Sequence, residues 1–240
     1  WTMLHLHHLD SLGLFDNNVF MMSGASGGNM GLSMYTFLKA RHRGDLKPIK
    51  AAIEEIGATN FLSGDFTGLI TRFPINFLPD LPGWSAAELE DRAEAMARSY
   101  YRIVGTNAGA FHYDSIRNQP YSAIWEKNDY KLPLFISNTT RAEDGMRGFA
   151  HPLKKIDLSP GMIDLTFNGA GVLSFPDAAF LANRFPIMSP AGRIEGKGHF
   201  VDAGNSDNSG ISTIMHFLRY MELGSKDTTA TGKTYARFLS

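Results

Sequence analysis

The sequence has no cysteine, no sizeable net charge of either sign and no long apolar run. Without cysteine, disulfide bonds and thiolate metal sites are excluded. A formal net charge of −1 provides no basic field for a nucleic acid, so we expect no nucleic-acid partner. No apolar run approaches the roughly eighteen residues of a membrane span, and no signal peptide is recognisable. We therefore expect a soluble domain, whose compartment the sequence does not define.

The apolar residues that are present suffice for one large core. The chain has 240 residues, of which 43% are hydrophobic, and this predicts a single domain over 1–240. Short apolar runs alternate with helical patterns along the chain. This alternation predicts an α/β fold with a central, mostly parallel sheet flanked by helices. The polar segment 225–240 is expected to be a mobile tail.

The first twelve residues predict a helix that is already under way at Trp1. Its apolar residues share one face, and no capping residue precedes them, so we expect further residues upstream. The same helix carries His5, His7 and His8, but residues two apart do not share a helical face and the H-E-x-x-H spacing is absent. We expect neither a metal nor another cofactor.

The most informative stretch joins a short apolar run, Val19–Met22, to a glycine-rich turn, Gly24–Gly28, which reads G-x-S-x-G. Apolar residues then recur at helical spacing: Met30, Met34, Phe37 and Leu38. Strand, tight turn and helix are the context in which this motif presents a nucleophilic serine, here Ser26. The glycines Gly24 and Gly28 permit the backbone to fold back, and the N–H of Gly27 would face a developing oxyanion. The alternative is an ordinary glycine-rich turn.

A second turn supplies a carboxylate. Gly198–Gly204 reads as a short strand that runs into a turn containing Asp202 and Gly204. A carboxylate hydrogen-bonded to a serine can accept its proton. In a parallel sheet, the carboxyl ends of the strands before Ser26 and Asp202 would share one edge, which predicts that the two side chains meet. The alternative is a turn aspartate that binds its own backbone.

Together, Gly24-Ala25-Ser26-Gly27-Gly28 and Phe200-Val201-Asp202-Ala203-Gly204 resemble motifs of the patatin-like phospholipases. The segment Leu181–Pro190, in which a small-residue helix enters a proline bend, is similar to the one that precedes the aspartate strand in that family. The resemblance implies a three-layer α/β fold and lipid acyl ester hydrolysis by a Ser–Asp dyad. It assigns Ser26 as nucleophile and Asp202 as base, with no cofactor.

The sequence departs from the family pattern at two places. Ala203 stands where the family usually has glycine, and the glycine-rich G-G-G-x-R-G oxyanion loop is absent before the helix at residues 1–12. We expect that loop upstream. Within the sequence itself, Gly27 is then the visible oxyanion donor.

Two other functions compete with the dyad. An α/β-hydrolase would use a Ser26–Asp202–His216 triad, although His216 falls in the middle of a predicted helix. A non-catalytic lipid-binding module would keep the fold without the activity. The apolar, proline-rich stretch Phe61–Trp84 has three interpretations: a cap over an apolar pocket, a surface for peripheral membrane contact, or a loop-rich part of the core.

Overall fold

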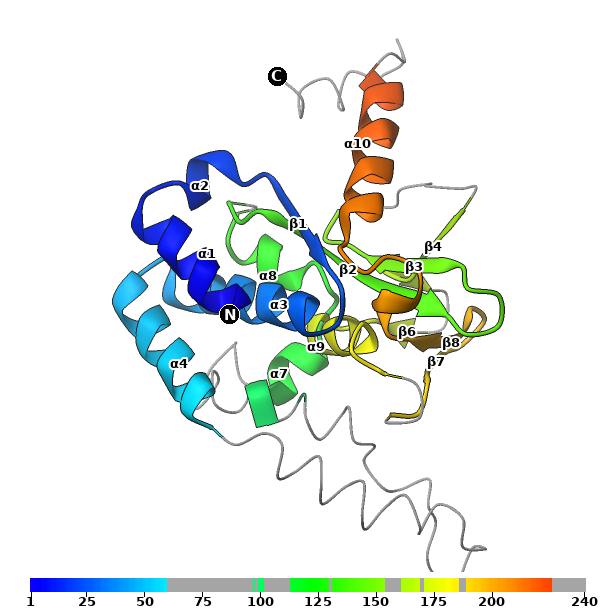
Figure 1. Cartoon of the computed structure of the whole chain (residues 1–240), viewed down its shortest axis with the longest axis horizontal. Coiled ribbons are helices and arrows are strands. Elements are labelled where there is room, and N and C mark those ends of the chain that lie inside the picture. The colour runs from blue at the N-terminus through cyan, green and yellow to red at the C-terminus, as the bar shows by residue number, and fades with distance from the viewer. Residues whose placement is uncertain are drawn as a thin grey trace, which may run out of the picture.

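The computed structural model describes residues 1–59, 97, 99–101, 113–129, 131–153, 161–168, 171–185 and 189–225, and Figure 1 shows their arrangement. The helices are α1 (Thr2–Ser11), α2 (Phe15–Asn18), α3 (Ser26–His42), α4 (Leu46–Ala58), α7 (Tyr113–Arg117), α8 (Ala123–Glu126), α9 (Phe175–Leu181) and α10 (Ile211–Ser225), with a 3₁₀ turn η2 at Ala203–Asn205. The strands are β1 (Met21–Gly24), β2 (Leu134–Arg141), β3 (Arg147–Ala150), β4 (Met162–Asp164), β5 (Phe167–Asn168), β6 (Gly171–Val172), β7 (Gly192–Ile194) and β8 (Gly198–Val201). The fold is α/β, as the sequence predicts.

The sheet corrects one prediction, because it is mixed rather than mostly parallel. Six strands form it, with β1 parallel to β2 and β3 parallel to β4. The pairs β2–β3, β2–β8 and β7–β8 are antiparallel. The physical reason lies in the connections: the links between β2 and β3 and between β7 and β8 are too short to cross over the sheet, so each forms a hairpin. Gly145 and Gly196, both at φ +73°, make the left-handed turns that these hairpins need.

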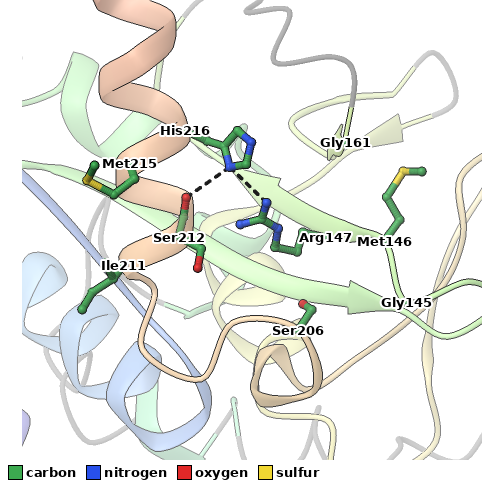
Figure 2. Close-up of a pocket in the computed structure, with 9 residues that line it drawn as sticks. All are labelled: Gly145, Met146, Arg147, Gly161, Ser206, Ile211, Ser212, Met215 and His216. Carbon is green, nitrogen blue, oxygen red and sulfur yellow. Dashed lines mark hydrogen bonds between the residues drawn. The ribbon is translucent and has the colours of Figure 1, made fainter.

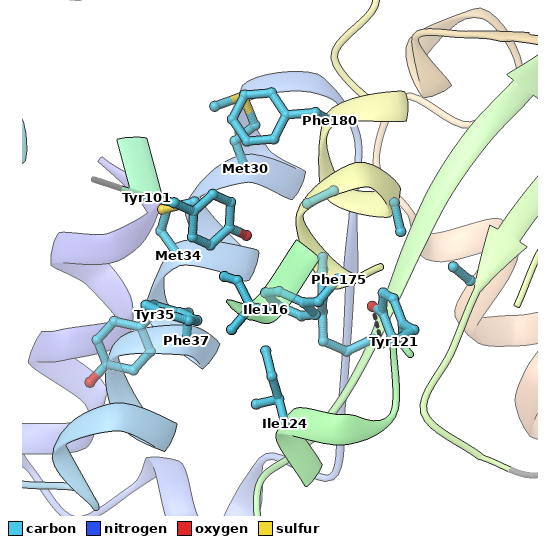
Figure 3. Packing of buried hydrophobic residues seen from close by; sticks show 14 of the residues in the cluster. Met30, Met34, Tyr35, Phe37, Tyr101, Ile116, Tyr121, Ile124, Phe175 and Phe180 are labelled. Atoms are coloured by element: carbon cyan, nitrogen blue, oxygen red, sulfur yellow. Dashed lines mark hydrogen bonds between the residues drawn. The ribbon is translucent and has the colours of Figure 1, made fainter. Parts of the chain in front are cut away.

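Helices pack on both faces of the sheet. Phe135 of β2 belongs to a large apolar cluster with α1, α3, α4, α8 and α9, whereas the next residue, Ile136, packs with Phe217 and Met221 of α10. This alternation follows from the pleat of a strand. Figure 3 shows the first cluster, in which α3 and α9 face each other across buried aromatic rings. The fully buried Tyr121 donates its hydroxyl to the Phe135 carbonyl at 2.8 Å, which ties this core to β2.

The helix predicted at residues 1–12 is confirmed as α1, and the one after the glycine-rich turn as α3. The four apolar residues that predicted α3 are all buried: Met30, Met34, Phe37 and Leu38. Other predictions fall outside the described residues, namely the stretch Phe61–Trp84 and the tail from residue 226 onward. Within the described ranges, no helix is long and apolar enough to cross a membrane.

Candidate active site

Ser26 sits in a strained turn between β1 and α3. Its φ is +48°, in the left-handed region that non-glycine residues avoid. Within the described residues only two others share this feature, Arg43 and Asp129. Arg43 caps the end of α3, a usual place for that conformation. Ser26 instead stands at the start of a helix, where the conformation costs about 1–3 kcal/mol and turns the side chain out of the strand.

The glycines around Ser26 divide into one that is confined and two that border open space. A Cβ added to Gly24 would lie 3.0 Å from Leu32 Cδ1 and 3.2 Å from the Asn29 nitrogen, so the turn requires a residue without a side chain there. A Cβ on Gly27 or Gly28 would meet nothing within 4 Å in the described part of the chain. Their N–H groups lie at the start of α3, where helix geometry leaves them without partners and the dipole is positive. An anion therefore has room and donors beside Ser26.

Asp202 is a buried carboxylate of which one oxygen accepts a hydrogen bond and the other has no partner among the described residues. Its side chain is only 3% exposed. Oδ1 accepts the N–H of Gly204 at 2.7 Å, whereas Oδ2 is buried and has no hydrogen-bond partner among the described residues. Gly204 is closely fitted in this turn, because an added Cβ would lie 3.0 Å from Asp202 Oδ1 and would press against it. A buried acceptor without a hydrogen bond lowers the stability of the folded state, and other interactions have to offset this loss.

The two turns approach each other for a reason other than the predicted one. Strand β3 pairs with one edge of β2, so β1 and β8 share the opposite edge. Because β1 is parallel and β8 antiparallel to β2, their carboxyl ends point toward each other along that edge. The two β2 residues between them hold both ends: Asn138 Nδ2 donates to the Gly24 carbonyl at 3.2 Å, and the Thr139 hydroxyl donates to the Val201 carbonyl. The carboxyl ends of β1 and β8 thus face each other along β2, and they do not lie side by side at one end of a parallel sheet as predicted.

Asn183 links the two turns. The Ser26 hydroxyl donates to Asn183 Oδ1 at 3.3 Å, and no hydrogen bond joins Ser26 to Asp202 among the described residues. The carbonyl of Arg184, next in sequence, accepts the Asp202 N–H at 2.9 Å. Ala25, Ala182 and Ala203 also pack together as a small buried cluster. Sequence analysis missed Asn183 because no spacing rule connects it with Ser26, although it lies in the segment that resembles the patatin-like family.

The loop after Asp202 closes against β1. Gly210, at φ +77°, lies so close to β1 that an added Cβ would stand 2.5 Å from the Gly24 nitrogen. Asp207 anchors this loop to the start of α10: its Oδ2 accepts the N–H of Thr213 at 2.9 Å, and its Oδ1 accepts the N–H of Gly210 at 3.0 Å. Burial alone would raise the pKa of Asp207, but the hydrogen bonds from Thr213, Ser209 and Gly210 outweigh burial and lower it.

The lowered pKa of Asp207 predicts a pH-dependent stability. Such a carboxylate stabilises the fold above its unfolded pKa of about 3.9, and this contribution is lost as the pH falls through the folded value. Asp207→Asn should lower stability at pH 7 by about 1–2 kcal/mol, because the amide keeps one acceptor oxygen and turns its NH₂ group toward an N–H that the carboxylate binds. Thermal unfolding followed by circular dichroism at pH 7 and pH 3 should show the difference from wild type shrinking in acid.

The matched change Asp144→Asn, at an exposed pair with Arg141, should alter the melting temperature little. A difference that is equal at both pH values would contradict this role of Asp207.

The histidines considered for a triad lie elsewhere. His216, on α10, has its Nδ1 3.0 Å from Arg147 Nη2. The same Nδ1 lies 3.3 Å from the Ser212 carbonyl oxygen. A guanidinium can only donate, so Nδ1 accepts in the shorter contact with Arg147 and cannot then donate to Ser212. His199 is exposed and bonds Glu143 at 2.8 Å. Neither histidine contacts Ser26 or Asp202 through any hydrogen bond found in the described residues.

Comparison with protein-family models, curated proteins and solved structures gives no match. Function therefore has to be argued from the geometry of Ser26, Asp202 and their surroundings. The part of the chain that the structure describes holds no group of three or more His, Cys, Asp or Glu side chains arranged to bind a metal ion.

Proposed function

We propose that the protein is a serine acyl hydrolase that cleaves carboxylic esters through an acyl-enzyme on Ser26. The observation that carries this proposal is the strained Ser26 turn together with a buried carboxylate, Asp202, whose Oδ2 has no partner among the described residues; Ala25 and Ala203, next to these two residues in sequence, pack in one cluster. Strain of this kind persists only where the surroundings enforce it, and it concentrates at functional sites.

In the proposed mechanism, the Ser26 hydroxyl turns from Asn183 toward Asp202 Oδ2, which accepts its proton as Oγ attacks the ester carbonyl. Catalytic hydrogen bonds are often incomplete without substrate, so the resting contact with Asn183 is compatible with this step. Collapse of the tetrahedral intermediate expels the alcohol, which takes the proton back from Asp202. Water then attacks the acyl-enzyme and gives a proton to the same carboxylate, which passes it to Ser26 Oγ as the carboxylic acid leaves.

The oxyanion of the intermediate would be held at the start of α3. The N–H of Gly27 is the first candidate donor, and Gly27 is exposed and borders open space. A positioned N–H group near the positive end of a seventeen-residue helix stabilises the negative charge that develops on the oxyanion. One such donor typically contributes a hundredfold to a thousandfold in rate.

The proposed substrate class is a lipid acyl ester, and the proposed fold family is the patatin-like one. Support comes from the two turn motifs and from the helices that cover both faces of the sheet. A panel of fluorogenic esters with increasing acyl length tests the substrate class. Turnover should rise with chain length from acetyl to octanoyl, and a preference for acetyl would argue against a lipid substrate.

A dyad predicts that histidine replacement is tolerated. His216→Ala and His199→Ala should keep most of the ester-hydrolysis rate, because imidazole takes no part in the proposed proton transfer. Rates should be measured on variants whose folding is verified by circular dichroism. Should folded His216→Ala be as inactive as Ser26→Ala, a Ser–Asp–His triad would replace the dyad.

Asn183 offers a second test of which group is the base. An amide oxygen is too weak a base to take the serine proton, so Asn183→Ala should change kcat by no more than about tenfold, the effect of one ordinary hydrogen bond. Side-by-side kcat values for Asn183→Ala and Asp202→Asn decide the matter. A larger loss at Asn183 than at Asp202 would shift the essential role to Asn183.

A further inference from the structure

A second candidate site lies on the other side of the loop that follows Asp202. Figure 2 shows this open depression of about 670 Å³ between β3 and the first turns of α10. Its described lining residues are Gly145, Met146, Arg147, Gly161, Ser206, Ile211, Ser212, Met215 and His216. Of these, Arg147 is the only arginine or lysine, and none is acidic. Ser26 does not line the depression, so the inference is independent of the proposed hydrolysis.

Arg147 is a partly buried cation for which the described residues supply no counter-ion. Its Nη2 donates to His216 Nδ1 at 3.0 Å, and its Nη1 is buried with no hydrogen-bond partner among the described residues. Guanidinium groups withdrawn from water are normally paired with a carboxylate or a phosphate. Here the partner is a histidine nitrogen, which carries no negative charge.

Acidic residues on the adjoining segments are bound to other groups. Their partners are His199 for Glu143, Arg141 for Asp144, His151 for Asp164 and Thr213 for Asp207. Among the described residues, none of these four carboxylates neutralises Arg147, so its positive charge is available to a ligand. Ser212, in the first turn of the fifteen-residue helix α10, lines the depression and adds a hydroxyl.

Apolar side chains surround this cation. Met146, Ile211 and Met215 are 37%, 62% and 60% exposed, although each is large and hydrophobic. A small inorganic anion would leave these side chains in water, whereas a ligand with an alkyl chain would cover them. We propose that the depression binds an oxyanion headgroup, phosphate or carboxylate, that carries an apolar tail, with Arg147 as its counter-ion.

Isothermal titration of the full chain separates the contributions of charge and tail. The probes are octyl phosphate, octanoate, inorganic phosphate and the neutral octyl glucoside, each below its micellar concentration. We expect octyl phosphate or octanoate to bind at least about tenfold more tightly than the last two, with the preferred headgroup given by their ranking. Inorganic phosphate binding as tightly as octyl phosphate would overturn the role of the apolar tail.

Matched variants assign the binding to Arg147. Arg147→Met should weaken the preferred amphiphile at least tenfold, whereas Arg219→Met, which removes the same charge from an exposed position on α10, should stay within about twofold. Should Arg147→Met misfold, Ser212→Asp offers a test that removes nothing buried: its carboxylate at the helix start should neutralise Arg147 and abolish binding, unlike the isosteric Ser212→Asn. Absence of saturable binding to the folded wild type, or equal losses in the two arginine variants, would overturn the proposal.

Discussion

Replacing Ser26 with alanine should lower kcat/KM for a soluble ester by about four orders of magnitude or more, because the acyl-enzyme can no longer form. The neighbouring change Ser23→Ala is the matched control. Ser23 donates to the Ile136 carbonyl at 2.8 Å and accepts from Asn138 Nδ2 at 2.9 Å, so its loss should cost about 1–2 kcal/mol of stability and little activity. A Ser26→Ala protein that retains wild-type turnover would remove Ser26 from the mechanism.

The strain at Ser26 gives this prediction a second readout. Glycine adopts a φ of +48° without steric cost, whereas alanine does not. Ser26→Gly should therefore be more stable than Ser26→Ala by roughly 1 kcal/mol, although both are inactive. Equal melting temperatures for the two variants would mean that the turn relaxes and that Ser26 carries no strain.

Replacing Asp202 with asparagine should produce the second large loss. The amide keeps the size of the carboxylate and can still accept the Gly204 N–H, but it cannot take a proton from Ser26. We expect kcat to fall by several orders of magnitude, and the double variant Ser26→Ala/Asp202→Asn to lose little more, because the two residues act as one unit. If the fall in kcat of the double variant were the product of the falls in the two single variants, Ser26 and Asp202 would serve separate functions.

Asp207, five residues further along, is the natural control for Asp202. Both carboxylates are buried. Both oxygens of Asp207 accept hydrogen bonds, whereas Oδ2 of Asp202 has no hydrogen-bond partner among the described residues. Asp207→Asn should thus destabilise the fold and spare the chemistry, whereas Asp202→Asn should spare the fold and abolish the chemistry. Ester-hydrolysis rates and melting temperatures of both variants provide the comparison. Destabilisation by Asp202→Asn with unchanged turnover would make Asp202 a purely structural residue.

Local features of the sequence were predictable. The apolar run, the glycine-rich turn and the helical spacing after it led to β1, the turn at Ser26 and α3. The short strand before Asp202 was recognisable for the same reason, since each element is encoded within a few consecutive residues. The confined Gly24 also matches the expectation from the motif, whereas Gly28 borders open space in the described structure.

Features that depend on distant residues were not predictable. The mostly parallel sheet was wrong because the hairpins at Gly145 and Gly196 were not recognised as such. The contact of Ser26 with Asn183 joins residues 157 positions apart, and the approach of Gly210 to Gly24 depends on tertiary packing. The contact of Arg147 with His216 likewise emerges only once β3 and α10 are placed together.

Covalent labelling tests the central proposal, a nucleophilic Ser26, most directly. The full chain would be treated with a fluorophosphonate, digested, and mapped by mass spectrometry. The proposed mechanism predicts one phosphonyl adduct on Ser26, formed far more slowly in Asp202→Asn and absent in Ser26→Ala. An unlabelled wild-type protein, or an adduct on any other residue, would contradict it.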